Sequence, residues 1–220
     1  QLNSIQGCSE EIAALESKLR QAEQEMKALA TKIHDMREGA QALLCDEMKR
    51  LLVGLGIKHA EFVVELVALE HFTPTGCDDV RFLFSANKNQ QPGEIAKVAS
   101  GGEISRVMLA LKYVLSGSKQ LPVIVFDEID TGLSGEVAHR MAQMMKEMAT
   151  RMQVISISHL PQIAAAGDCH FKVYKEDNQD FTISHIRKLS YDERVKEIAG
   201  MMSGEEISVA ALEAAQNLLK

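Results

Sequence analysis

The chain has 220 residues, which is enough for one sizeable hydrophobic core and an appended segment. Its 24 Lys and Arg residues against 31 Asp and Glu residues give a formal charge of −7 without a basic run, which argues against strong nucleic-acid binding by this chain alone. The four cysteines are scattered without a CxxC pair and no apolar run approaches about 18 residues, so the sequence predicts no zinc site, disulfide framework or membrane span.

Residues 12–36 are predicted to form a coiled-coil helix. Apolar residues recur there in alternating steps of three and four, between Glu, Gln, Lys and Arg and without Pro or Gly. They are Ile12, Leu15, Leu19, Ala22, Met26, Leu29, Ile33 and Met36. An ordinary amphipathic helix is the alternative. Gly39 interrupts the strict pattern, and we expect the helix to end near residue 54, which divides a coiled-coil stub (1–54) from a head domain (55–220).

A hairpin and a loop are predicted next. Residues 59–69 alternate and are rich in Val and Phe, residues 73–76 have the composition of a turn, and residues 80–85 form a second short strand. The polar residues 87–98 are predicted to be a loop that leads to Ser100.

The residues Ser100, Gly101, Gly102 and Glu103 begin a helix with an apolar face. Ser-x-x-Glu in this position is also a capping box. Capping does not explain two glycines in the first turn, because each costs about 1 kcal/mol relative to Ala. Bare N–H groups at a helix N-terminus bind phosphate, so we favour a phosphate site here over simple capping.

A strand, a helix and a second strand follow. Residues 121–126 are a short apolar run that is entered through a proline, which is typical of a buried parallel strand. Apolar residues recur at helical spacing over about 135–150, and residues 153–158 are rich in β-formers. The sequence therefore predicts a right-handed βαβ unit.

Polar side chains stand where each of these strands ends. Asp127 and Glu128 follow the first strand, and His159 follows the second. The carboxyl ends of parallel strands are where open α/β sheets bind ligands. We therefore expect these three residues to meet in one site.

The remainder of the chain is predicted to be a short helix, a hairpin and two helices. The helix spans residues 161–166 after a proline, and residues 170–175 and 181–187 form the hairpin near the sheet edge. Residues 190–202 and 205–219 have the pattern of two final helices.

Three stretches in this order resemble the ATP-binding-cassette ATPases. They are SGGEISRVMLALK from Ser100, VIVFDEIDTGLSG from Val123, and ISISHLPQIAA from Ile155. Within that superfamily the chain is similar, from about Ala99 to its end, to the RecN family of SMC-like ATPases that repair bacterial DNA double-strand breaks. The resemblance implies an α/β fold, the C-terminal lobe of an SMC-like head with a parallel-sheet βαβ core, preceded by a coiled-coil helix stub.

The resemblance also implies roles for the site residues. Asp127 is expected to be the Walker B carboxylate that holds Mg²⁺ through water, and Glu128 to orient or deprotonate the attacking water. His159 resembles the switch histidine that contacts the γ-phosphate. Asp130, with residues 131–135, falls where the family has its D-loop, which crosses the dimer interface and couples the two sites.

The resemblance further implies that half of the active site lies elsewhere. The four residues Ser100 to Glu103 are expected to bind ATP that is held mainly by the other subunit of a homodimer. The sequence contains no Gly-Lys dipeptide and therefore no Walker A loop, which family members have in the half before the coiled coil. The chain also begins with Gln, and we expect a piece of a longer protein that is inactive by itself.

The expected cofactors are ATP and Mg²⁺. The expected partners are the N-terminal half of the head, a second copy of the chain, and DNA, which the full-length protein would bind. The expected location is the cytoplasm, at the nucleoid, and no membrane partner is expected. Three alternatives stay open. They are the nucleotide-binding motor of a membrane transporter, a scaffold without catalysis, and an SMC protein proper. The heptads that precede the signature segment SGGEISRVMLALK, together with the DEIDTGLSG variant, disfavour the transporter motor. Glu128 disfavours the scaffold without catalysis.

Overall fold

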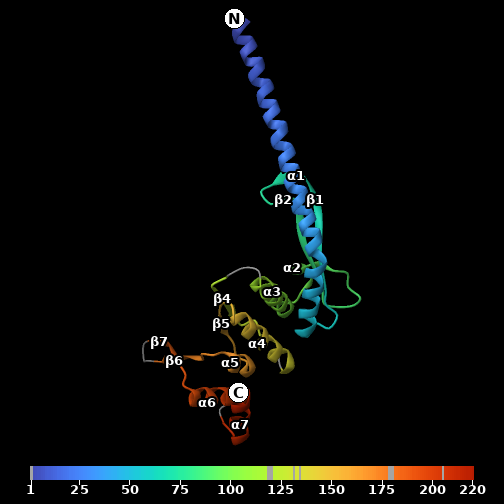
Figure 1. Ribbon diagram of the computed structural model, residues 1–220. Coiled ribbons are helices and arrows are strands. Elements are labelled where there is room, and N and C mark those ends of the chain that lie inside the picture. The colour runs from blue at the N-terminus through green and yellow to red at the C-terminus, as the bar shows by residue number, and fades with distance from the viewer. Residues whose placement is uncertain (1, 118–120, 131, 134, 178–180, 205) are drawn as a thin grey trace.

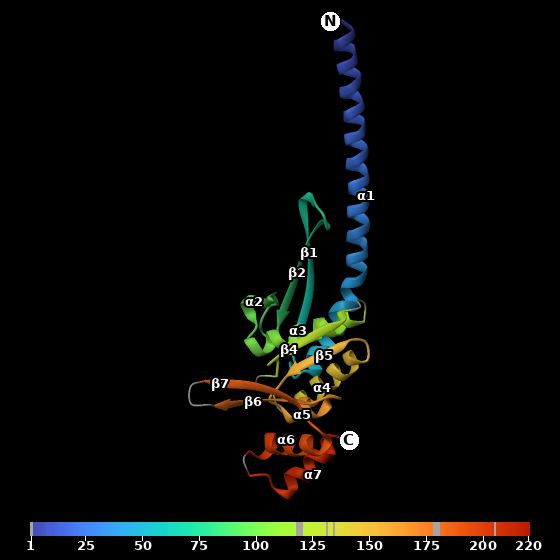
Figure 2. The same ribbon diagram turned by 90° about the vertical axis from the view of Figure 1, so that its left-hand side faces the viewer.

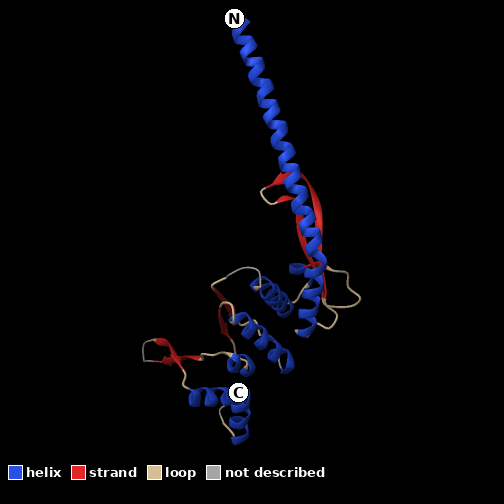
Figure 3. Cartoon of the chain, in the orientation of Figure 1, coloured by secondary structure: helices blue, strands red, loops and turns tan. Residues whose placement is uncertain are grey.

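The computed structural model describes residues 2–117, 121–130, 132–133, 135–177, 181–204 and 206–220, with side chains from residue 11 onward. In chain order the elements are α1 (Leu2–Gly54), β1 (Glu61–Thr73), β2 (Gly76–Ser85), β3 (Gly93–Glu94), α2 (Ile95–Val98), α3 (Gly101–Ser116), β4 (Val123–Asp127), α4 (Gly135–Ala149), β5 (Gln153–Ile157), α5 (Pro161–Ala166), β6 (Phe171–Asp177), β7 (Thr182–Lys188), α6 (Tyr191–Ser203) and α7 (Val209–Leu218). The long α1 projects from a head that contains the other elements (Figure 1). Figure 3 shows helices and strands mixed throughout this head, which confirms the predicted α/β class.

Helix α1 runs without a break from Leu2 to Gly54 and ends where the sequence predicted. Gly39 does not interrupt it. The last turns of α1 enter the main hydrophobic core of the head through Met48, Leu51 and Leu52, which are buried. The stub is therefore rooted in the head, and the division of the chain at residue 54 stays a prediction.

The outer part of α1 is a single helix that exposes its apolar seam. The exposed large side chains on it are Ile12, Leu15, Leu19, Met26, Leu29 and Met36. A helix with a row of apolar side chains in water gains free energy by pairing with another helix. The long helix is confirmed, and its pairing into a coiled coil stays a prediction.

Strands β1 and β2 form the predicted antiparallel hairpin, which lies along α1 (Figure 2). Phe62 and Phe84 face each other across the pair, and both are buried in the main core. The loop predicted over residues 87–98 is partly wrong, because β3 pairs with β2 and the short α2 follows it. A two-residue strand and a four-residue helix are too short to leave a periodic pattern in the sequence.

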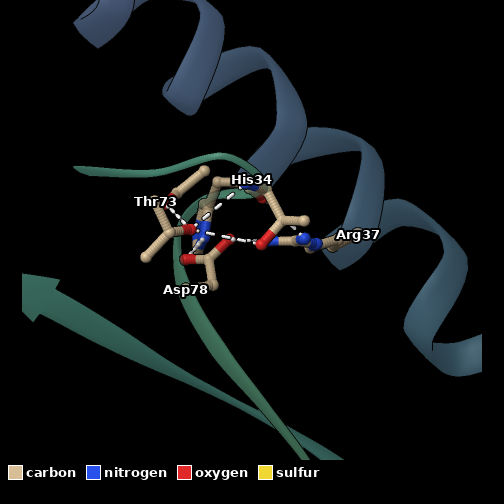
Figure 4. A network of polar contacts seen from close by, with 6 residues as sticks. His34, Arg37, Thr73 and Asp78 are labelled. Carbon is tan, nitrogen blue, oxygen red and sulfur yellow. Dashed lines mark hydrogen bonds and ion pairs between the residues drawn. The ribbon is translucent and has the colours of Figure 1, made fainter.

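A polar cluster fastens the hairpin to α1 beyond the midpoint of the helix, at His34 and Arg37 (Figure 4). The buried carboxylate of Asp78 lies 2.8 Å from His34 Nδ1 and accepts a hydrogen bond of 3.0 Å from Arg37 Nη1. Arg37 Nη2 also donates to the carbonyl oxygen of Thr75 in the turn, at 2.8 Å. We call His34, Arg37 and Asp78 the hairpin clamp. None of its residues was singled out from the sequence, because His34 and Arg37 lie 44 and 41 positions before Asp78.

The clamp is expected to be pH-dependent. Asp78 raises the pKa of His34 through a hydrogen bond and its charge, and the hydrogen bonds from His34 and Arg37 lower the pKa of Asp78. Because the pKa of His34 is raised in the folded chain, its protonated form stabilises the fold at pH values below the ordinary histidine pKa of about 6.5. This contribution disappears as the pH rises through the pKa that His34 has in the folded chain. Because the pKa of Asp78 is lowered in the folded chain, its ionised form stabilises the fold at pH values above the ordinary aspartate pKa of about 3.9. This contribution disappears as the pH falls through the pKa that Asp78 has in the folded chain. The clamp should therefore be strongest between these limits.

We expect His34→Gln to lower the thermal midpoint of the chain more at pH 6 than at pH 8.5, as measured by circular dichroism. His59→Gln is the matched control, because His59 is exposed and forms no ion pair that the described residues show. Its effect should be small at both pH values. An equal loss for His34→Gln at the two pH values would contradict the proposed linkage.

Strands β4 and β5 are parallel neighbours joined by α4, which confirms the predicted βαβ unit. The expectation that the first strand is buried on both faces is wrong. Ile124 and Phe126 are buried, whereas Val123 and Val125 point to the other face and are exposed. Strand β5 is likewise mostly exposed. One face of this small sheet lacks a covering layer among the described residues.

The C-terminal part of the head has its own small core. The helix, hairpin and two helices predicted for this part are all present as α5, β6–β7, α6 and α7, and α5 packs with α6 and α7. Helix α7 begins at Val209 and not near residue 205, because Ser208 caps it by accepting a hydrogen bond from the Ala211 N–H. None of the described helices is long and apolar enough to cross a membrane.

Candidate functional site at the ends of β4 and β5

The parallel register of β4 and β5 brings the predicted site residues to one edge of the sheet. Asp127 pairs in register with Ile157, so Glu128 on one strand and Ser158 and His159 on the other continue beyond the same edge. The Glu128 N–H donates to the Ile157 carbonyl oxygen at 3.1 Å. The prediction that the two strand ends meet is confirmed.

Glu128 has an unusual backbone conformation. Its φ is +47°, and it is the one residue other than glycine with a positive φ in the described part of the chain. A side chain with a Cβ is strained in this region, and such strain persists where the surrounding structure enforces it, often at functional sites. The strained turn after β4 therefore makes Glu128 a candidate functional residue.

Asp127 is an exposed carboxylate at the end of β4. Mg²⁺ in phosphate-transfer sites is bound by one or two carboxylates, with waters and substrate phosphates completing the shell. Among the described residues no group of three His, Cys, Asp or Glu side chains converges to hold a metal ion. The residues present fit a site in which Asp127 contributes one ligand and the nucleotide contributes others.

Asp130, which the sequence analysis placed in the D-loop, has a buried side chain. Its side chain is only 1% exposed and accepts a hydrogen bond from the Ser158 hydroxyl of the same chain. The other carboxylate oxygen, Oδ1, is 3.7 Å from His159 Nδ1. This side chain therefore contacts the segment after β5 of its own chain, and the role of the D-loop at a dimer interface stays a prediction. Thr131 and Ser134 of the expected D-loop lie outside the described residues.

Ser158 was not assigned a role from the sequence. It links Asp130 to the segment after β5, because its oxygen also accepts the Leu160 N–H at 3.0 Å. His159 extends from this segment with its side chain 64% exposed, where an incoming ligand can reach it. The available signal was the Ser-His pair at the end of a strand, next to an acid that follows the neighbouring strand.

The glycine-rich segment at the start of α3 forms the capping box that was the alternative to a phosphate site. The Ser100 N–H and hydroxyl both donate to the Glu103 carboxylate, at 2.7 and 2.9 Å. A Cβ at Gly101 would meet nothing within 4 Å, so packing within this chain does not require glycine there. Capping is thus confirmed, and phosphate binding by Ser100, Gly101, Gly102 and Glu103 stays a prediction.

The two parts of the expected nucleotide site remain separate in this chain. The polar contacts of Ser100 and Glu103 in the described residues are with each other and do not reach Asp127 or His159. One edge has the exposed carboxylate of Asp127, an acid in a strained turn and an exposed imidazole. The other is an open helix N-terminus. Neither part has a lysine-containing phosphate loop.

Comparison with known proteins identifies what this arrangement is similar to. Residues 10–182 match the family described as the RecF/RecN/SMC N terminal domain. The chain is 34% identical, over all of its length, to the DNA repair protein RecN of Haemophilus influenzae, and 39% identical, over 96% of its length, to the protein of that name from Deinococcus radiodurans. It spans 39% of the length of each of these curated relatives.

Solved structures share the fold. The Smc head domain with a coiled coil and joint from Pyrococcus yayanosii superposes with a TM-score of 0.56 at 19% identity, covering 86% of this chain and 36% of that one. A structure from a study of ATP-driven dimerization and DNA-stimulated activation of SMC ATPases superposes with a TM-score of 0.51 at 19% identity, covering 79% of this chain and 99% of that one. The architecture is that of an SMC-type head.

Proposed function

The chain belongs to the RecF/RecN/SMC family, and from that premise we propose that it is the C-terminal half of a RecN-type ATPase head that acts in the repair of DNA double-strand breaks. The full-length protein would bind and hydrolyse ATP as a homodimer and act on DNA, in the cytoplasm at the nucleoid. The observation that supports this most directly is the convergence of Asp127, Glu128 and His159 at the ends of two parallel strands. The relatives named DNA repair protein favour this function over the transporter alternative.

The chemistry follows from the types of side chain at this edge. Transfer of a phosphoryl group to water needs a metal ion to neutralise phosphate charge, a group that orients the water, and donors to the γ-phosphate. Asp127 would hold Mg²⁺, Glu128 would orient or deprotonate the water, and His159 would donate to the γ-phosphate. ATP and Mg²⁺ supply the reacting phosphate and the Lewis acid when bound.

The uncovered sheet supports the proposal that the other half of the head is a separate stretch of polypeptide. The open face of β4 and β5 exposes Val123, Val125, Ile155 and Ile157, with Val125 57% and Ile157 53% exposed. Strand β5 pairs with β4 only, so its second edge has unpaired N–H and C=O groups within the described residues. Parallel sheets are normally covered on both faces, and open apolar edges promote aggregation. A segment with the Walker A loop would cover this face.

We also propose that this chain is the C-terminal part of the full-length protein. The matching family is described as an N terminal domain. We assign the chain to the C-terminal half because a Gly-Lys dipeptide is missing, and because the helix enters the head from the outside before the signature-like segment. In the homodimer, Ser100 to Glu103 would face the nucleotide of the other subunit. The open surface above Gly101 is compatible with such an approach.

ATP hydrolysis by the full-length protein tests this function. Hydrolysis that is stimulated by Mg²⁺ and that depends on both Asp127 and Glu128 is expected. Hydrolysis that persists without either carboxylate would show that the site lies elsewhere.

The exposed seam of α1 should make this chain self-associate. No helix among the described residues covers the exposed apolar side chains between Ile12 and Met36, and a second copy can provide one. We expect sedimentation velocity to show dimers or larger species for the complete chain. Removal of residues 1–38 should reduce them. Equal, monomeric masses for both forms would contradict a coiled-coil seam.

A further inference from the structure

We propose that Asp130 is a positioning residue for His159, which it orients through the Ser158 hydroxyl and through its own second carboxylate oxygen. The inference rests on the proposed ATP hydrolysis and extends it to two residues that have no role in that proposal. Asp130 follows β4, and Ser158 and His159 follow β5, so this contact joins the two strand ends that form the site.

The first reason is that Asp130 is a buried carboxylate with which no lysine or arginine of the described residues forms an ion pair. A carboxylate removed from water is unfavourable unless hydrogen bonds or a cation compensate it. Asp78, the other buried acid in the described residues, has both His34 and Arg37. Asp130 has the Ser158 hydroxyl on Oδ2, whereas Oδ1 is buried without a hydrogen-bond partner in the described structure. Among the described residues, the imidazole of His159 lies close enough to this oxygen to donate to it after a small movement.

The second reason is the geometry between the two side chains. His159 Nδ1 lies 3.7 Å from Asp130 Oδ1, slightly beyond hydrogen-bond distance. Ser158 is fixed from both sides, since it donates to Asp130 and accepts the Leu160 N–H. The backbone that bears His159 is therefore held, while its exposed ring can still rotate. A small rotation lets Nδ1–H donate to Oδ1.

This contact would determine what the other ring nitrogen can do. When Nδ1–H donates to a carboxylate, the tautomer and the orientation of the imidazole are fixed. Nε2 then points away from Asp130 toward the open edge, where the γ-phosphate would lie. Loss of Asp130 should therefore slow the chemical step and leave ATP affinity nearly unchanged.

A double-mutant cycle in the full-length protein tests the inference. Asp130→Ala is expected to lower kcat for ATP hydrolysis about tenfold, the low end of the roughly 10–100-fold loss for groups that orient a metal-bound histidine, with KM within about twofold. His159→Ala should lower kcat at least as much, and the double variant should be no slower than His159→Ala alone. If Asp130→Ala does not fold, the same cycle is made with Ser158→Ala, which removes the link and adds no bulk.

Asp78→Ala is the matched control, because it also removes a buried aspartate that contacts a histidine, but in the hairpin clamp. It should lower the thermal midpoint and leave kcat unchanged, alone or with His159→Ala. Independent losses for Asp130→Ala and His159→Ala that multiply in the double variant would overturn the inference, as would normal hydrolysis in His159→Ala. A different result would contradict the proposed function itself, namely normal ATP hydrolysis by the Glu128→Gln variant.

Discussion

Glu128→Gln in the full-length protein is expected to bind ATP normally and to hydrolyse it at least about 100-fold more slowly, since a positioned general base contributes roughly 10²–10⁴-fold. Glutamine keeps the shape of the side chain and removes the charge that orients or deprotonates water. The residue sits in a strained turn with a φ of +47°, so the replacement must tolerate the same backbone. Single-turnover hydrolysis and equilibrium nucleotide binding should be measured on the same preparation.

Asp127→Asn is the companion variant that separates metal binding from water activation. It removes the charge of the proposed metal ligand, so nucleotide binding itself should weaken in the presence of Mg²⁺ and change little in its absence. The two variants should therefore differ: Glu128→Gln should bind ATP and fail to hydrolyse it, whereas Asp127→Asn should bind ATP weakly when Mg²⁺ is present. Full hydrolysis in Glu128→Gln, or equal behaviour of the two variants, would show that the chemistry is assigned to the wrong residues.

The isolated chain should bind ATP at least about 100-fold more weakly than the full-length protein. Each charge-assisted hydrogen bond contributes about 1.5–3 kcal/mol, so losing the lysine and one further donor of a phosphate loop costs about 3–6 kcal/mol, or roughly 10²–10⁴-fold in affinity. Turnover by the chain alone should be near background. Nucleotide binding by calorimetry, before and after addition of the N-terminal half of the head, measures this directly.

The uncovered sheet provides a control for this reconstitution. Val125→Lys places a charge on the exposed face of β4 without disturbing the buried residues on its other face. It should prevent the N-terminal half from binding and from restoring nucleotide affinity. Val173→Lys, on the exposed strand β6, is the same exchange at another exposed apolar position. Robust ATPase activity from the 220-residue chain alone would contradict the proposed division of the site.

The order of elements was predictable because local patterns determine it. The heptad spacing of α1, the β-rich runs of the hairpin and the strand-helix-strand pattern all depend on neighbouring residues, and each produced the expected element. Burial was not predictable in the same way. An apolar run such as 121–126 is typical of a strand covered on both faces, but Val125 is exposed because no described element covers it.

The candidate site was predictable up to the level of the strand ends. Parallel strands end at a common edge, so Asp127, Glu128 and His159 could be placed together from the sequence. The pairing of Ser158 with Asp130 joins residues 28 positions apart, and such a contact depends on the turn after β4. The strain at Glu128 is likewise a property of that turn and leaves no trace in composition.

The uninterrupted helix α1 also has a mechanical consequence. The hairpin clamp holds it at His34, with about 30 Å of helix between the clamp and its buried end and about 48 Å beyond the clamp toward Leu2, at 1.5 Å per residue. The clamp can thus act as a fulcrum and α1 as a lever. A shift of about 1 Å at the buried end would become about 1.6 Å at the far end, given the ratio of these lengths. Small movements of the head would then be amplified along the outer part of α1, and breaking the clamp would leave the helix attached to the head through its buried end and through Gln41.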